Sequence, residues 1–333
     1  MRTPYIALVA AAAMTAPAGA HADKGKGARK TGVVEQDIVR SAPDDGKEIS
    51  LVDIDNRLGD VEIEGHDKNE IVIVAVKRAP DDETLERLKV TMVTHPNGQV
   101  TISTALKTGS REARPIPAGS VGVDLLVRAP RSAAVEATLW NGRIEVESVD
   151  NGADLSVNAG SIDVRHASGK IRTKSARGGQ QFSELIDATI DAQSVAGDMN
   201  VDTVSGDALD ASIHDGRFVG RNIRVGRATV RTTRGDITIE GEMLPTGVYK
   251  FSSVRGDIEL RLSPARARAR TAAVKVLAYA RRGTVNLPSS FRSREDIETG
   301  VVSGSYGTGK ESAHVALRSR AGSITVIGFD FDF

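Results

Sequence analysis

Cysteine is absent from this chain of 333 residues, which excludes disulfides, thiol catalysis and cysteine-ligated metal sites. Aromatic residues make up only 4% of the composition, so the core has to be built mainly from valine, isoleucine, leucine and alanine. A net charge is lacking too, because 44 basic residues balance 44 acidic ones. This balance gives no overall reason to expect nucleic acid as a partner. After position 22, no stretch reaches the roughly 18 consecutive apolar residues that a transmembrane segment needs.

Residues 1–22 have the pattern of a cleavable signal peptide. Arg2 supplies the positive start, an apolar stretch covers 6–14, and small residues follow. Two cleavage sites fit this pattern, one after Ala20 and one after Ala22. The apolar stretch is too short for a membrane-spanning helix. The sequence therefore predicts export by a cleavable signal peptide, with the mature protein either periplasmic or secreted.

Two segments are predicted between the signal peptide and the repeats described next. Residues 23–47 are small and polar, which predicts a flexible linker. From residue 48 to 131, apolar and polar residues alternate in short runs separated by turn signals, which predicts an N-terminal β-rich module. Within it, Pro80 and several acidic residues predict a short helix over 81–88.

A unit made of glycine, a polar residue and two apolar residues spaced two apart recurs from residue 142 onward. One series of glycines returns with a period of roughly 19 residues: Gly142, Gly160, Gly178 or Gly179, Gly197, Gly216, Gly235 and Gly256. A second series lies between them, with Ala188 in the one slot without glycine: Gly152, Gly169, Gly206, Gly226 and Gly247. Two interleaved series with one period predict an all-β solenoid with about 19 residues per coil, two strands and two corners, over residues 132–333.

The glycines of the first series are predicted to be structural corner residues. A sharp corner requires a positive φ, which glycine adopts without strain, and the polar residue after it points to solvent. The six clearest corner positions are Gly142, Gly160, Gly197, Gly216, Gly235 and Gly256. After Gly256 the spacing loosens, which fits either coils with insertions or a closing sheet. The phenylalanines within 329–333 are expected to contribute to a C-terminal cap that covers the exposed end.

With the repeats in view, the chain resembles a bacterial family of unknown function named "putative adhesin". The resemblance extends over about residues 48–328 and rests on the segments 56–63, 129–130, 204–207 and 321–326. It implies an exported β-solenoid with repeats of the Ser-Gly-Asp-Ile type. It brings no catalytic or binding residues with it.

Several short motifs invite a catalytic or metal-binding interpretation that their context does not support. The segment 304–311 resembles a phosphate-binding loop, but Glu311 stands where serine or threonine should ligate magnesium. Two Arg-Gly-Asp tripeptides, at 234–236 and 255–257, occupy corner positions where polar-Gly-polar is expected in any case. The aspartates that follow corner glycines lack the spacing of calcium-binding β-roll repeats, and the histidines lie on separate segments. No catalytic, cofactor-binding or metal-binding residue is predicted.

Arg266, Arg268 and Arg270 alternate with alanine and form the most concentrated charge in the sequence. They are interpreted either as a solvated edge strand or as a contact for an anionic glycan or lipopolysaccharide. The sequence favours a non-catalytic, adhesin-like binding or scaffold protein of the cell envelope, with an envelope glycan or protein as partner. The alternatives are a polysaccharide-acting enzyme on the same fold and a self-assembling structural protein of the envelope.

Overall fold

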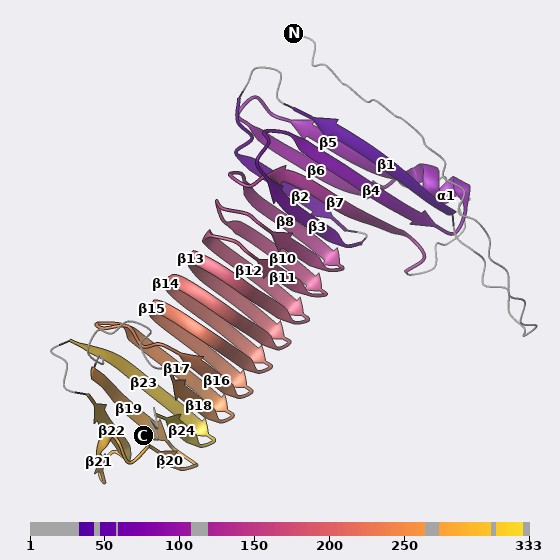
Figure 1. Cartoon of the computed structure of the whole chain (residues 1–333). Helices are drawn as coiled ribbons and strands as arrows, with labels where there is room; N and C mark the ends of the chain where they lie inside the picture. The colour runs from indigo at the N-terminus through magenta and orange to yellow at the C-terminus, as the bar shows by residue number, and fades with distance from the viewer. Residues whose placement is uncertain are drawn as a thin grey trace, which may run out of the picture.

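The computed structural model describes residues 33–42, 47–57, 59–107, 119–263, 273–307 and 311–328. It is a β-solenoid: stacked coils form a rod, with the N-terminal strands at one end and the C-terminal strands at the other (Figure 1). Each coil has one strand before its corner glycine and one after it. We call the two resulting layers of parallel strands sheet A and sheet B, respectively.

The central coils stack in sequence order. In sheet A, β8 (Ala134–Asn141), β10 (Ala153–Ala159) and β12 (Gly169–Arg177) pair in parallel, and in sheet B β9 (Ile144–Glu147) pairs with β11 (Ile162–Arg165). Three long strands then turn through the second corner of the coil and contribute to both sheets. They are β13 (Gln180–Ala196), β14 (Met199–Asp215) and β15 (Phe218–Arg234).

The register confirms the predicted period. Met199 pairs with both Gln180 and Phe218, so the three residues occupy equivalent positions in successive coils. Their numbers differ by the interval that the glycine series predicted. Three shorter strands continue the stack: β16 (Ile237–Gly241) and β18 (Ile258–Leu262) in sheet B, and β17 (Val248–Arg255) in sheet A. Because neighbouring strands lie about 4.8 Å apart, each coil lengthens the rod by about that amount.

The core is a thin layer of mostly aliphatic side chains between the two sheets. One inward position of sheet B carries a column of buried residues that are in register from coil to coil: Val61, Ile144, Ile162, Gln180, Met199, Phe218, Ile237, Ile258 and Ile324. Gln180 is the polar member of this column. Its amide nitrogen donates to the Gln193 carbonyl at 2.7 Å, and its oxygen accepts from the Thr173 hydroxyl at 2.6 Å. These bonds satisfy a polar group that would otherwise be costly to bury.

At the N-terminal end the chain doubles back across its own first coil. That coil consists of β2 (Leu51–Asn56) and β3 (Val61–His66). On one side it pairs with β8 and β9, and on the other with β6 (Gln99–Leu106) and β7 (Gly122–Pro130). The boundary predicted between residues 131 and 132 is therefore not a structural break, since both sheets continue across it.

Antiparallel strands close this end. In sheet A, β5 (Leu88–Thr94) pairs with β6, and in sheet B β4 (Ile71–Ala79) pairs with β7 and with β1 (Val33–Ser41). The predicted linker over 23–47 is therefore wrong at 33–41, where β1 forms. The sequence of β1 is polar because most of its side chains face solvent. The predicted helix is present as α1 (Asp82–Arg87), where the Asp81 side chain accepts from the Thr84 amide.

At the C-terminal end the chain also folds back, so that its last described coil lies between two earlier ones. The last described strands, β23 (Ser312–Ala321) and β24 (Ile324–Ile327), lie between β17 and β18 on one side and β19 (Ala273–Ala280) and β20 (Val285–Asn286) on the other. Two antiparallel strands, β22 (Val301–Tyr306) and β21 (Arg292–Asp296), then extend sheet A. The loosened glycine spacing thus reflects both an inserted coil and a closing sheet. The phenylalanines of 329–333 lie outside the described residues.

No helix among the described residues is long and apolar enough to cross a membrane.

Candidate functional site

The predicted corner glycines line one long edge of the rod. Their φ values lie between 136° and 153°: Gly142, Gly160, Gly197, Gly216, Gly235 and Gly256. At Gly216 an added Cβ would lie 2.2 Å from the carbonyl oxygen of Gly197 in the preceding coil. The position therefore requires glycine for two reasons, the positive φ and the close approach of the neighbouring backbone. These residues build the coil and offer no chemistry of their own.

The aspartates after corner glycines bond to the next coil. The carboxylate of Asp198 accepts from the backbone amide of Arg217 at 2.8 Å and from its guanidinium at 2.8 Å. These bonds from Arg217 hold the pKa of Asp198 below its ordinary value. Asp60 accepts from the amide of Arg143 in the same way, at 2.8 Å. These aspartates thus link adjacent coils through hydrogen bonds.

The two Arg-Gly-Asp tripeptides follow the same pattern. Asp236 accepts from the amide of Asp257 at 2.8 Å, and Asp257 accepts from the amide of Ser323 at 2.7 Å. Arg234 forms an ion pair with Asp215 at 2.8 Å. Both carboxylates are therefore already engaged within the solenoid.

A column of buried hydroxyls supports the corners from inside. It lies three positions before the corner glycine in five of the coils, at Ser175, Ser194, Thr232, Ser253 and Ser319. The Ser319 hydroxyl donates to the Gly256 carbonyl at 3.0 Å, and the Thr232 hydroxyl donates to the Gly235 carbonyl at 2.9 Å. These polar residues hold the backbone in place and do not form a catalytic set.

Within the part of the chain that the structure describes, the other sequence-based candidates do not come together into a site. No group of three or more histidine, aspartate or glutamate side chains within the described residues could hold a metal ion. The loop-like segment 304–311 leads from β22 directly into β23, a strand, whereas a phosphate-binding loop leads into a helix. Arg266, Arg268 and Arg270 lie outside the described residues.

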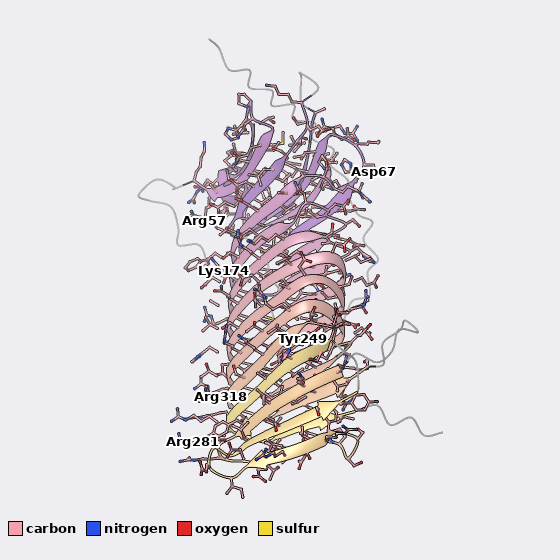
Figure 2. All side chains as sticks on the ribbon, turned by 90° about the vertical axis from the view of Figure 1, so that its left-hand side faces the viewer. Arg57, Asp67, Lys174, Tyr249, Arg281 and Arg318 are labelled. Atoms are coloured by element: carbon pink, nitrogen blue, oxygen red, sulfur yellow. The ribbon has the colours of Figure 1, made fainter. Side chains whose placement is uncertain are left out.

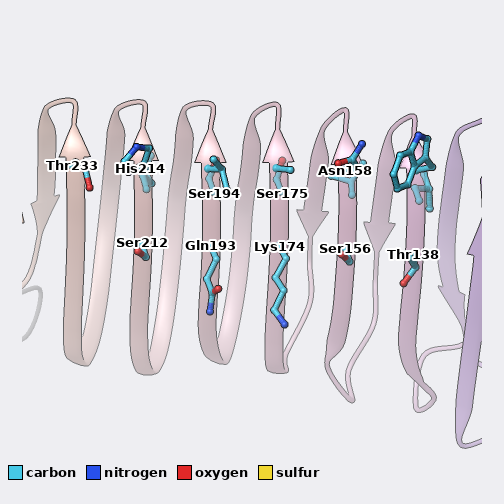
Figure 3. Close-up of a pocket in the computed structure, with 16 residues that line it drawn as sticks. Thr138, Ser156, Asn158, Lys174, Ser175, Gln193, Ser194, Ser212, His214 and Thr233 are labelled. Carbon is cyan, nitrogen blue, oxygen red and sulfur yellow. The ribbon is translucent and has the colours of Figure 1, made fainter.

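An open groove of about 650 Å³ crosses the outer surface of sheet A from β8 to β15 (Figure 3). Two outward positions of each coil line it, two and four places before the corner glycine. The position four places before carries Thr138, Ser156, Lys174, Gln193 and Ser212, which form one row across successive strands in Figure 3. The position two places before carries Trp140, Asn158, Ala176, Val195, His214 and Thr233.

Uncharged hydrogen-bonding groups dominate this groove, and one aromatic ring lies at its N-terminal end. Trp140 is the chain's single tryptophan and is 62% exposed, although a side chain of that size is normally largely buried. Hydroxyls and amides recur beside it on neighbouring strands, with Lys174 as the one lysine or arginine in the lining. A flat aromatic ring beside repeated neutral donors and acceptors suits an extended, polar, uncharged ligand.

The groove has no contiguous signal in the sequence because its residues come from six different coils. A periodic signal is nevertheless present. Residues two and four positions before each corner glycine lie on the same, outward face of the strand. When the repeats are aligned on their glycines, Trp140 and Asn158 therefore fall in the same position of neighbouring coils.

Comparison with protein families supports the fold. A family model described as Toastrack DUF4097 matches residues 49–326, which is most of the chain. No curated protein matches.

Solved structures give distant likenesses only. A "putative adhesin" from Parabacteroides merdae has 10% identity and a TM-score of 0.41, with 88% of this chain and 96% of that chain covered. A "putative adhesin" from Bacteroides fragilis has 13% identity and a TM-score of 0.41, covering 88% and 97%. A "putative lipid binding protein" from Parabacteroides distasonis has 10% identity and a TM-score of 0.36, covering 90% and 98%.

Proposed function

The chain belongs to the Toastrack family DUF4097, and on that premise we propose that it is a non-catalytic binding protein of the cell envelope that holds an uncharged glycan chain along its groove. The observation that carries the proposal is the groove itself. It is long, open and shallow, and it repeats one pair of outward positions over five successive coils, with Thr233 added from a sixth. Such a surface matches a ligand that is itself extended and repetitive.

The chemistry of the groove favours a glycan over a protein segment. The exposed indole of Trp140 offers an apolar face on which a sugar ring can stack. The amides of Asn158 and Gln193 and the hydroxyls of Ser156 and Ser212 offer both donors and acceptors, as sugar hydroxyls require. Because strands are about 4.8 Å apart, these groups recur at short, regular intervals along the rod.

The polar groups that the solenoid brings together at its first corner already have structural partners. The corner aspartates bond to backbone amides of the next coil, and the buried hydroxyls bond to glycine carbonyls. A general acid or base must instead be within reach of a substrate proton. The role we propose is therefore to bind and present a ligand.

We place this role in the cell envelope because of the predicted signal peptide over 1–22. In this proposal the mature protein is exported, and the rod presents its groove to glycans outside the cytoplasm. Secretion of a tagged full-length chain, with its mature N-terminus determined, tests this part. A chain that stays in the cytoplasm with residues 1–22 still attached would exclude it.

Intrinsic fluorescence tests glycan binding directly, because Trp140 is the sole tryptophan. The purified protein is titrated with neutral hexasaccharides of β-linked glucose, β-linked N-acetylglucosamine and α-linked glucose. We expect a saturable change in tryptophan emission with at least one of them. Calorimetry should then show that Trp140→Ala weakens binding roughly tenfold or more, as expected for an aromatic residue that carries much of the binding energy.

Val93→Ala is the matched control, since Val93 is also an exposed apolar side chain, 42% exposed, but lies on β5 outside the groove. It should bind as the unmodified protein does. The proposal fails if no hexasaccharide changes the emission or produces heat. It fails in favour of the enzyme alternative if a bound hexasaccharide is shortened and one substitution abolishes the shortening.

A further inference from the structure

The balanced net charge of the chain conceals a strong separation along the rod. Residues 1–220 contain 25 basic and 33 acidic side chains, a net charge of −8. Residues 221–333 contain 19 basic and 11 acidic side chains, a net charge of +8. Since the coils stack nearly in sequence order, the described residues of these two parts lie toward opposite ends of the rod (Figure 1).

Much of the positive charge gathers on the outer surface of sheet A in the last coils. The two outward positions that line the groove become arginine there: Arg231 and Arg318 lie four places before a corner glycine, and Arg320 and Arg281 lie two places before one. Lys250 and Lys275 occupy other outward positions of the same surface, and all six side chains are exposed. We call these six residues the basic surface. Figure 2 shows Lys174, Arg318 and Arg281 along one edge of the rod.

No carboxylate occupies an outward position of β17, β23 or β19, the described strands that carry most of the basic surface. The outward positions of β17, β23 and β19 carry only basic, apolar or uncharged polar side chains. None of its six cations forms an ion pair in the described part of the chain, whereas Arg227, on β15, pairs with Asp210 at 3.1 Å. Unpaired cations this close together repel one another, so a folded protein that keeps them gains from an anionic partner.

We infer that the basic surface binds a linear anionic polysaccharide, independently of the neutral groove beside it. The register places its cations in lines that cross the strands. Ser252 lies between Arg231 and Arg318 in one such line, so the two arginines are separated by two strand spacings, roughly 10 Å. Guanidinium groups bind carboxylate, sulfate or phosphate oxygens in pairs, and a polymer can meet several of them in succession.

Two other polyanions fit this surface less well. Stable binding to a membrane needs an apolar face beside the cations, yet the exposed large apolar side chains here are only Val248, Val254 and Leu277. A single-stranded nucleic acid needs aromatic rings for base stacking. The outward positions of β17, β23 and β19 offer only Tyr279, and the Arg318 guanidinium already lies over that ring, 5.8 Å from its centroid.

Binding to immobilised dextran sulfate and to polygalacturonate tests the inference, with uncharged dextran as the polymer control. We expect both anionic polymers to bind in about 0.1 M salt and to be released in about 1 M salt, because the screening length falls from roughly 10 Å to about 3 Å. The double substitution Arg281→Glu with Arg320→Glu should weaken binding roughly tenfold or more, because it places like charges opposite the polymer. The neutral pair Arg281→Gln with Arg320→Gln should give an intermediate loss.

The matched control is Lys89→Glu with Arg221→Glu, which changes the net charge equally at two exposed sites, on β5 and on sheet B. It should bind the anionic polymers as the unmodified protein does, and circular dichroism should show the same β-content in all variants. Equal loss in both double variants would overturn the inference, because net charge alone would then explain binding. So would binding to phosphatidylglycerol vesicles or oligothymidine without binding to either anionic polysaccharide. Trp140→Ala should leave polyanion binding unchanged, which separates this site from the groove.

Discussion

The two corners of each coil both reverse the direction of the chain, but they differ in residue type and backbone conformation. The first corner carries glycine with φ between 136° and 153° in the six coils predicted from the sequence. The second corner contains some glycines with positive φ, such as Gly152 and Gly206, but it also contains non-glycine residues with φ between 49° and 61°: Ser148, His166, Glu184, Asp187, Thr203 and Asn222. A positive φ alone therefore does not demand glycine in this fold. The contact between stacked backbones does, because the first corner leaves no room for a Cβ.

Among substitutions at the two corners, we expect the largest loss of stability when a side chain is added at the first corner. In Gly216→Ala the new Cβ would meet the Gly197 carbonyl oxygen at 2.2 Å, at a φ of 150° that alanine rarely adopts. We expect a loss of about 3 kcal/mol or more in the free energy of unfolding, measured by urea denaturation. Gly226→Ala is the control from the second series, since φ is not positive there and the new Cβ would lie 3.3 Å from the Asp207 carbonyl oxygen. An equal loss in both variants would mean that stacking does not select glycine.

A smaller effect is expected at the second corner. Asn222 is exposed and has a φ of 52°, a left-handed conformation that asparagine tolerates and valine does not. Asn222→Val should lower the free energy of unfolding by about 1–2 kcal/mol, and Asn222→Gly should change it by under about 0.5 kcal/mol. Thermal denaturation of both variants beside the unmodified protein checks this. If glycine at position 222 stabilised the protein strongly, the two corners would not differ as described.

The buried hydroxyls behind the first corner should contribute less again. Ser319 donates to the Gly256 carbonyl at 3.0 Å, so Ser319→Ala should cost about 1 kcal/mol. The Gly235 carbonyl accepts from both Thr232, at 2.9 Å, and Ser253, at 3.0 Å. Ser253→Ala should therefore cost less than Ser319→Ala, and its cost should rise when Thr232→Val is also present. Additive costs in this double-mutant cycle would show that the two hydroxyls do not share the carbonyl.

Much of the coil was predictable from the sequence because the first corner repeats a strict local requirement. Glycine, a polar residue and two inward apolar residues return at a nearly constant interval, and this pattern depends only on contacts between neighbouring coils. The helix over 82–87 was predictable for a similar reason, since Asp81 caps it locally.

The ends of the rod and the groove were not predictable in this way. The repeat period shows which residues are equivalent, but it does not show the order in which the coils stack. The sequence therefore contains no local pattern that predicts the pairing of β2 with β6 and of β3 with β7. The polar sequence of β1 predicts a linker, because only its pairing with β4 makes this segment a strand. The groove gathers one or two outward residues from each of six coils, and outward positions are under little constraint from the core.

The smallest effect should come from the carboxylate that follows the corner glycine, and it should depend on pH. Asp198 accepts from the amide and the guanidinium of Arg217, each at 2.8 Å, and the lowered pKa of Asp198 means that folding favours its charged form. Asp198→Ala should therefore cost under about 1 kcal/mol at neutral pH, since the pair is largely exposed. A depressed pKa contributes stability above the ordinary carboxyl value of 3.8, and that stability is lost as pH falls through the folded-state value. The gap in unfolding free energy between Asp198→Ala and the unmodified protein should thus close in acid.

Asp207 supplies the matched control for this pH dependence. It follows Gly206 at the second corner and is exposed, and its carboxylate forms no hydrogen bond or ion pair within the described residues. Asp207→Ala should therefore change stability by under about 0.5 kcal/mol at either pH, as urea denaturation in neutral and acid buffers would show. A gap for Asp198→Ala that persists unchanged in acid would mean that its carboxylate does not tie the coils together.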